Sequence, residues 1–304
     1  MQLYDENYHD TDAEFQELWD LLIESYALTR SPNNWLFDRL EDWKYGANAQ
    51  RAEQNPHFFA EHAHLWRDAA SRLVGFCIAE YADNSVYLQV HPQYRCIEDA
   101  QLAWAEATWG RGKESIATYA YTHDTLRRQL LTRRGYADAG ESGRMYTFDL
   151  TRRYPAAALP QGFRIASLAE DHNIESHIAA VASAFGRATL NRAWFETKIT
   201  APTYAPAWDL AVISPAGEHV AFCLARLDEQ NRVAEIDPIG TRPEYQRRGL
   251  AKALVAECFC RLRACGMRYA YIGAGPKSAV GNRLYESLGS VALFKEHSWI
   301  KQLT

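Results

Sequence analysis

The residues with the clearest chemical potential follow a predicted strand and open a predicted helix, in the segment Gln246-Arg247-Arg248-Gly249-Leu250-Ala251. The first N–H groups of a helix have no partner within it and point outward, with the positive end of the helix dipole behind them. Gly249 lets a ligand approach the backbone, and the two arginines add positive charge. The segment predicts a phosphate-binding site, although a helix start with a solvated basic turn would have the same sequence.

This pattern resembles that of a known family. Gln/Arg-x-x-Gly-x-Gly/Ala after a β-strand is the acyl-CoA signature of the GCN5-related N-acetyltransferase (GNAT) superfamily. A second stretch, 279–289, is similar to a helix end of that family, with Leu284-Tyr285 at the motif position. Ser290 stands where the family usually has Phe, and Ser278 where Asn is common. The resemblance covers 163–304 and implies that this part binds an acyl-CoA.

In the family, the loop amides bind the CoA pyrophosphate and the preceding strand pairs with the pantetheine arm. Carried over to this sequence, the resemblance implies the following acyl-CoA-binding residues: Ile239, Gly240, Thr241, Gln246, Arg247, Arg248, Gly249, Leu250, Ala251, Asn282 and Tyr285.

Transfer of an acyl group from a thioester to an amine benefits from a base for the amine and an acid for the leaving thiolate. The resemblance implies that Tyr285 is the acid and that Glu235, eleven residues before the first loop residue, is the base. Strand alternation places Glu235, Asp237, Ile239 and Thr241 on one face, so Asp237 is a second candidate base. The alternatives are a core tyrosine and a strand carboxylate that faces solvent.

The elements that position these residues are predicted from periodicity and turn signals. In the C-terminal half, strands are expected at 163–166, 209–214, 220–227, 232–241, 268–273 and 291–301, and helices at 171–185, 191–200, 249–265 and 278–288. The turn 215–218 joins a predicted hairpin, and His219 beside it is expected at the surface.

The N-terminal half gives a similar mixture of signals. Helices are expected at 15–26, 34–45, 98–109 and 125–134, and strands at 73–80, 85–90 and 115–121. A Pro/Ala-rich stretch over 153–162 can neither continue a strand nor start a long helix, so it is interpreted as a linker. The predicted domains are therefore 1–152 and 163–304.

The two halves repeat each other. Val90-His-Pro-Gln-Tyr-Arg95 matches Thr241-Arg-Pro-Glu-Tyr-Gln246 at an offset of 151 residues, and 130–136 matches 284–290 at an offset of 154. The fold class is therefore α/β (α+β): two tandem GNAT-like domains, each a mixed central sheet flanked by helices. In the first copy, Cys-Ile-Glu98 replaces Arg-Arg-Gly249 and Leu131 replaces Tyr285. This copy is interpreted as degenerate and unable to bind acyl-CoA in the usual way.

Composition excludes several classes of protein. The 304 residues carry 33 Lys+Arg and 38 Asp+Glu, a net charge of −5, which argues against a nucleic-acid or anionic-membrane partner. No apolar run is long enough for a membrane span. Six cysteines without a C-x-x-C pair indicate reduced thiols in a cytoplasmic protein with no metal site.

The expected function is an acyl-CoA-dependent N-acyltransferase that transfers acetyl from acetyl-CoA, its co-substrate, to a primary amine by direct attack in a ternary complex. The acceptor is expected to be a small-molecule or peptide amine; no motif identifies it, and none indicates the oligomeric state. One alternative is a non-catalytic module of the same fold that binds acyl-CoA or a protein partner. Another is an aminoacyl- or peptidyl-transfer enzyme built on paired GNAT folds, against which the negative net charge argues weakly.

Overall fold

The computed structural model describes residues 3–154, 158–187 and 189–303. The chain divides into two compact units: unit 1 comprises Met1–Arg144 with Phe294–Thr304, and unit 2 comprises Met145–Leu293. The strands β6 (Ala137–Asp149) and β12 (Ala292–Gln302) each begin in one unit and end in the other. The units thus divide within these two strands rather than at the predicted linker 153–162, of which 155–157 lie outside the described residues.

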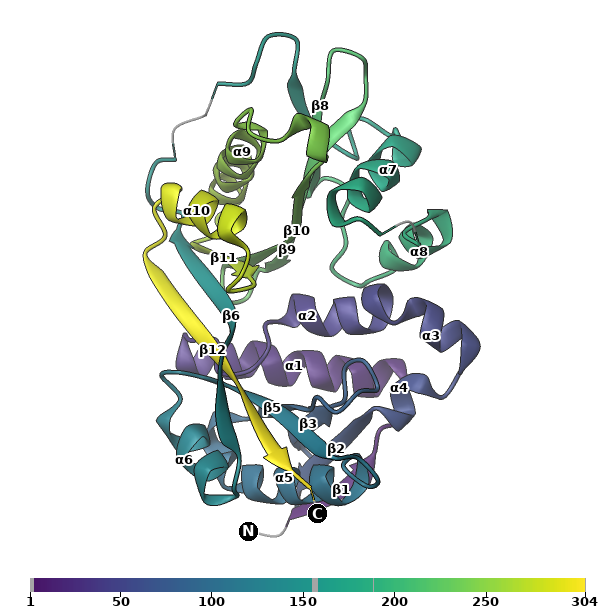
Figure 1. The fold of residues 1–304 in the computed structure, drawn as a ribbon, viewed down its shortest axis with the longest axis vertical. Helices are drawn as coiled ribbons and strands as arrows, with labels where there is room; N and C mark the ends of the chain where they lie inside the picture. Colours follow the sequence, from purple (N-terminus) through teal and green to yellow (C-terminus); the bar gives the residue numbers. More distant parts are fainter. Residues whose placement is uncertain (1–2, 155–157, 188, 304) are drawn as a thin grey trace. The chain divides into compact units, whose positions relative to one another are not determined.

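Unit 1 contains both helices and strands (Figure 1). Its helical elements are α1 (Asp12–Thr29), α2 (Phe37–Asp42), the π-helix η1 (Trp43–Ala47), α3 (Ala49–Gln54), α4 (Phe58–Glu61), the 3₁₀ helix η2 (Pro92–Ile97), α5 (Glu98–Thr108) and α6 (Thr125–Arg133). Its strands, besides parts of β6 and β12, are β1 (Leu3–Asn7), β2 (Ala63–Asp68), β3 (Leu73–Ile78), β4 (Tyr87–Val90) and β5 (Ser115–Tyr121).

The last strand of the chain pairs with a strand of unit 1 that lies outside the β1–β4 sheet. β1, β2, β3 and β4 lie side by side as antiparallel neighbours. Further along the unit, β12 pairs antiparallel with β5, from Glu296 opposite Tyr121 to Gln302 opposite Ser115. Most of the C-terminal strand is therefore part of unit 1, which contains the first copy of the repeat.

In unit 2, the strands lie side by side in the order β6-β11-β10-β9-β8-β7. Its strands, besides parts of β6 and β12, are β7 (Arg164–Ser167), β8 (Asp209–Ile213), β9 (His219–Asp228), β10 (Val233–Thr241) and β11 (Tyr269–Ala274). Its helical elements are α7 (Ile174–Phe185), α8 (Arg192–Lys198), the 3₁₀ helix η3 (Pro243–Tyr245), α9 (Leu250–Ala264) and α10 (Ala279–Ser287).

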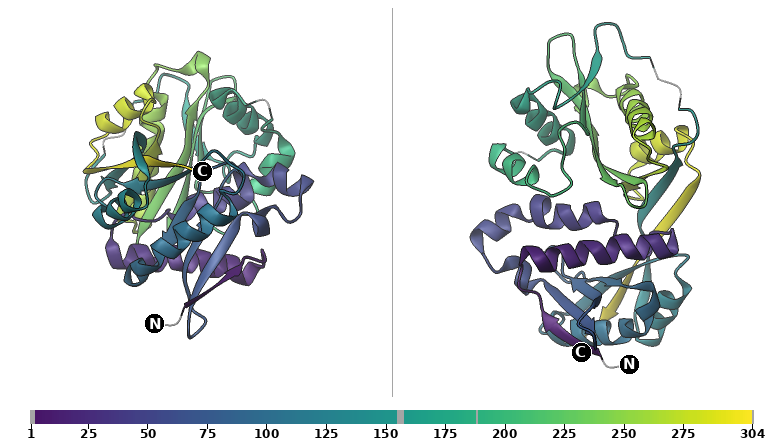
Figure 2. Two further views of the ribbon diagram at one scale, coloured as in Figure 1. Left: turned by 60° about the horizontal axis from the view of Figure 1, so that its bottom comes forward. Right: turned by 180° about the vertical axis from the view of Figure 1, so that it is seen from behind.

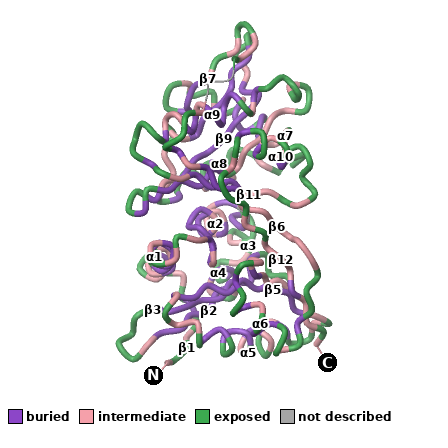
Figure 3. Tube along the Cα trace, turned by 90° about the vertical axis from the view of Figure 1, so that its left-hand side faces the viewer, coloured by how far each residue is buried: buried purple, intermediate pink, exposed green. Residues whose placement is uncertain are grey.

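Helices cover both faces of the unit 2 sheet. α9 and α10 lie on one face and α7 with α8 on the other, as Figures 1 and 2 show. The α9 face holds the main core of the unit, with Ala234, Ile236, Leu254 and Phe259 all buried. Figure 3 shows that buried residues concentrate on central strands such as β2 and β3 of unit 1 and β9 of unit 2.

The predicted mixed α/β class with helix-flanked sheets is confirmed, and most predicted elements are present. The predicted helix 34–45 is instead the short α2 followed by a π-helix. β1, β2, β6, α3 and α4 were not predicted. No helix in the described part of the chain is long and apolar enough to cross a membrane.

Candidate active site

The predicted anion-binding loop connects η3 to α9. Gly249 forms the N-cap of α9 with φ 79°, and no side chain caps this helix. Arg247 also has a positive φ, 65°. Left-handed residues in such a loop turn successive N–H groups toward one point, which is the geometry of a backbone anion site. The uncapped start of a 15-residue helix adds its dipole, and the side chains of Arg247 and Arg248 are exposed beside it.

A cavity of about 330 Å³ opens directly over this loop. It is bounded by the end of β10, the first turn of α9, α10 and the end of α7. The predicted residues that line it are Ile239, Gly240, Thr241, Gln246, Arg247, Gly249, Leu250, Ala251 and Tyr285. Sequence reasoning missed further lining residues: Ala184, Phe185, Tyr245, Lys252, Ser278, Val280, Gly281 and Leu284. Lys252, in the first turn of α9, adds a third cation near the loop.

Two of the predicted acyl-CoA contacts lie outside the cavity lining. The Arg248 guanidinium lies 5.0 Å from the ring centre of Tyr245 and donates to the backbone oxygen of Glu244 at 3.1 Å. Asn282 is buried, and its amide nitrogen donates to the backbone oxygens of Gly275 (3.1 Å) and Pro276 (3.3 Å).

Tyr285 combines burial with access to the cavity. Its side chain packs in the core beside α9 and also lines the cavity. Burial raises the pKa of Tyr285 above its usual value of 10.0, and the nearby Asp237 carboxylate raises it further. The phenol therefore holds its proton at neutral pH, as an acid must before it transfers one.

The two predicted carboxylates occupy different environments. β10 contains a bulge between Ile236 and Ile239: opposite them, β9 advances by only two residues, from Ala225 to Cys223. A bulge inserts one extra residue and reverses the alternation of faces beyond it. The prediction that Glu235 shares a face with Ile239 and Thr241 is therefore wrong.

Glu235 lies opposite Arg226 of β9, on the α7 side of the sheet, and is only 6% exposed. Asp237, within the bulge, is exposed and acts electrostatically on both Tyr285 and Arg226. Burial lowers the pKa of Arg226 to about 10, while Asp237 and Glu235 oppose this shift. The guanidinium thus remains charged at neutral pH. The signal for Arg226 in the sequence is a single arginine within the predicted strand 220–227, whose other residues are apolar.

The expectation that His219 lies at the surface is wrong, because its side chain is buried. Its Nε2 lies 3.3 Å from Asp171, and its Nδ1 lies 3.5 Å from the Nδ1 of His177. His177 Nε2 in turn lies 3.3 Å from Asp209. The four side chains form a polar chain beneath α7, which carries Ala184 and Phe185 at the cavity wall.

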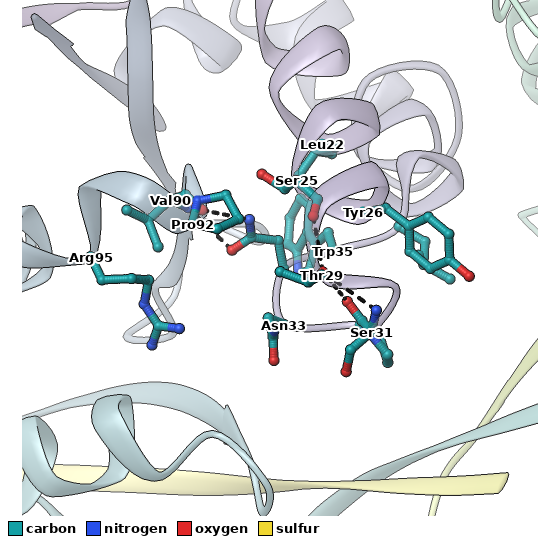
Figure 4. Close-up of a pocket in the computed structure, with 13 residues that line it drawn as sticks. Leu22, Ser25, Tyr26, Thr29, Ser31, Asn33, Trp35, Val90, Pro92 and Arg95 are labelled. Carbon is teal, nitrogen blue, oxygen red and sulfur yellow. Dashed lines mark hydrogen bonds between the residues drawn. The ribbon is translucent and has the colours of Figure 1, made fainter. Parts of the chain in front are cut away.

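The equivalent place in unit 1 is nearly filled. The cavity between α1, the following loop and the end of β4 has a volume of only about 20 Å³ (Figure 4). Arg95, the counterpart of Gln246, forms ion pairs with Glu98 and Asp124. Glu98 stands at the Gly249 position, is buried, and also pairs with Arg127. A carboxylate therefore occupies the position at which the second copy has the exposed backbone of Gly249.

The family model of the acetyltransferase (GNAT) family matches residues 175–289. Mycothiol acetyltransferase of Paenarthrobacter aurescens is 25% identical over 226 residues, which cover 70% of this chain and 69% of that protein. Mycothiol acetyltransferase of Thermobispora bispora is 27% identical over 228 residues, 71% of this chain and 76% of that protein.

Solved structures share the fold over nearly the whole chain. A tandem GNAT protein from the clavulanic acid biosynthesis pathway superposes with a TM-score of 0.66 at 14% identity, covering 99% of this chain and 98% of that one. A GCN5-related N-acetyltransferase from Sphaerobacter thermophilus gives a TM-score of 0.65 at 18% identity, covering 99% and 95%. The family match over α7 to α10, the mycothiol acetyltransferase relatives and the shared tandem fold together support a tandem-domain N-acetyltransferase of the GNAT superfamily.

Proposed function

We propose that this chain transfers the acetyl group of acetyl-CoA to a primary amine of a small molecule, with acetyl-CoA bound in unit 2. The observation that carries this proposal is the cavity of about 330 Å³ that joins the loop before α9 to Tyr285. The uncapped helix start and the cations of Arg247 and Lys252 suit a pyrophosphate. The backbone at the end of β10, from Ile239 to Thr241, lines the same cavity and suits the amides of pantetheine.

The proposed reaction uses two side chains of unit 2. The amine nitrogen attacks the thioester carbonyl carbon, so that a C–N bond forms, the C–S bond breaks and the CoA thiolate leaves. Asp237 accepts the proton that the amine loses, and Tyr285 donates a proton to the sulfur. Asp237 is preferred to Glu235 because it is exposed and lies within electrostatic reach of Tyr285.

The acceptor class is proposed from the relatives. The matched curated proteins are mycothiol acetyltransferases, which supports a small-molecule amine in preference to a peptide. A non-catalytic module has less support, because it would not need an acid at the cavity with a carboxylate in electrostatic reach of it.

The test is a screen of primary amines for thiol release from acetyl-CoA by the full chain. We expect one or more amines to be acetylated, and Gly249→Glu to abolish turnover by placing a carboxylate in the loop. Gly217→Glu is the matched control, since Gly217 also has a positive φ (81°) and open space around it but lies in the β8–β9 turn. Acetyl-CoA binding without transfer to any amine would favour the non-catalytic alternative.

A further inference from the structure

A tyrosine that precedes the predicted C-terminal domain lies beneath the helix that carries Tyr285. Tyr146, near the end of β6, is 1% exposed and belongs to the core of unit 2. Its phenol donates a hydrogen bond to Oδ1 of Asn282 at 3.0 Å. The Oε1 of Glu286, one turn later in α10, lies at 3.5 Å from the same phenol oxygen.

The hydrogen-bonding groups of the Asn282 carboxamide are all engaged in this arrangement. Its nitrogen donates to the backbone oxygens of Gly275 and Pro276, and its oxygen accepts from Tyr146. The Asn282 backbone N–H donates to the oxygen of Ser278 at 2.9 Å. Asn282 thus ties the loop after β11 to the first turn of α10, and Tyr146 fixes the orientation of its amide.

Tyr285 follows Asn282 by three residues on the same helix, so the two side chains share a helix face. The rings of Tyr146 and Tyr285 are in contact, with centroids 5.4 Å apart and planes at 57°. The position of the Tyr285 phenol at the cavity therefore depends on α10 and on the ring that packs against it. Removing the Tyr146 hydroxyl would leave the Asn282 oxygen buried without this donor, which favours displacement of α10.

We propose that Tyr146 is a positioning residue, which acts through Asn282 and ring contact to hold Tyr285 at the acetyl-CoA cavity. This inference rests on the proposed function of Tyr285. It assigns to the site a residue from the strand before the linker, outside the segment 163–304 that resembles the family. Small errors in the placement of a reacting group reduce turnover strongly, so the effect is expected in kcat.

The experiment is a double-mutant cycle on the full chain with Tyr146→Phe, Tyr285→Phe and the double variant, measured as kcat and KM for acetyl-CoA. We expect Tyr146→Phe to lower kcat about tenfold with KM changed less than about twofold, and to add little in the Tyr285→Phe background. Tyr154→Phe is the matched control. Like Tyr146, Tyr154 donates a hydrogen bond through its phenol, here to the backbone oxygen of Asp149 at 3.2 Å, and it packs on the same core. We expect Tyr154→Phe to leave kcat unchanged.

Three outcomes would overturn the proposal: Tyr146→Phe leaves kcat unchanged, its effect is the same with and without the Tyr285 hydroxyl, or Tyr285→Phe itself is silent. The last outcome would also refute the proposed acid, whereas the first two leave it intact. A crystal structure of the Tyr146→Phe variant requires no acceptor amine. It distinguishes failure of the positioning role from failure of the proposed acid. We expect α10 and 275–278 to shift relative to α9, and an unmoved Tyr285 would refute the positioning role regardless of the reaction catalysed.

Discussion

The side-chain amide of Asn34 pairs with both backbone groups of Val90: its nitrogen donates to the Val90 oxygen at 2.8 Å, and the Val90 N–H donates to its oxygen at 3.1 Å. Val90 is the counterpart of Thr241, whose backbone lines the unit 2 cavity. In the first copy, an internal side chain thus occupies the strand edge equivalent to the one that we propose binds pantetheine in the second copy. Figure 4 shows Val90 and Pro92 at the cavity of about 20 Å³ in unit 1.

We therefore predict one acetyl-CoA per chain. Titration calorimetry on the full chain should give a stoichiometry near one, and Gly249→Glu should abolish binding. Asn34→Ala should lower the thermal stability of the chain, because the buried Val90 backbone loses both partners. It should not create a second site, since Glu98 still fills the loop position. A stoichiometry of two in the wild-type chain would contradict this prediction.

The carboxylates of β10 should differ in their effect on turnover. Asp237→Asn should lower the rate of acetyl transfer at neutral pH, and the deficit should shrink as pH rises. The reason is that an amine with a pKa near 10.4 deprotonates without help at high pH. Glu235→Gln is the comparison, because Glu235 is buried opposite Arg226. A pH-dependent deficit in Glu235→Gln together with a silent Asp237→Asn would move the base to Glu235.

Tyr285→Phe should preserve acetyl-CoA binding and lower kcat by roughly 10²-fold, the usual range for loss of a general acid. Because the pKa of Tyr285 is raised above 10.0, its ionisation should not limit kcat in profiles measured up to about pH 10. Steady-state kinetics and calorimetry on the same variant provide both readouts. Unchanged turnover in Tyr285→Phe would mean that solvent protonates the thiolate.

The segment 163–304 should not fold stably alone. It lacks Tyr146, Phe148 and Leu150, which are at most 1% exposed in the core of unit 2. Their burial contributes about 5 kcal/mol or more in total, a large part of the stability of about 5–15 kcal/mol usual for a domain. A chain that begins at Met145 retains the end of β6 and is the control. Equal solubility and cooperative melting of both chains would show that this strand end is dispensable.

Stability should fall on mild acidification because of His177. Burial lowers the pKa of His177 to about 4, against 6.5 in an unfolded chain, and burial lowers the pKa of His219 as well. Between these values the unfolded state binds a proton that the folded state excludes, so stability is lost as pH falls from 6.5 toward 4. For His177 the loss is about 2 kcal/mol between pH 7 and pH 5.

Thermal unfolding at pH 7 and pH 5 tests how much His177 contributes to the loss of stability on acidification. His177→Asn, which does not titrate there, should show a smaller drop in Tm than the wild-type chain. His9→Asn is the control, since His9 is exposed. Equal drops in the wild-type chain and in His177→Asn would rule out the contribution of His177.

The sequence by itself determined the features that depend on neighbouring residues. The predicted anion-binding loop, the start of α9 and the position of Tyr285 on α10 are local, because a helix start and its glycine are set within a few residues. The repeat at an offset of 151 residues revealed the tandem fold, and Glu98 at the Gly249 position indicated the degenerate copy.

Only the tertiary structure decided which distant residues meet. The bulge in β10 depends on its pairing with β9. Its one extra residue places Glu235 and Thr241 on opposite faces of the sheet. Tyr146 and Asn282 are 136 positions apart, and Asn34 and Val90 are 56 apart. Such pairs leave no periodic signal, because contacts distant in the chain form only when the sheet and its helices pack. For the same reason, the assignment of β12 from Phe294 onward to unit 1 follows from its pairing with β5 and not from its place in the repeat.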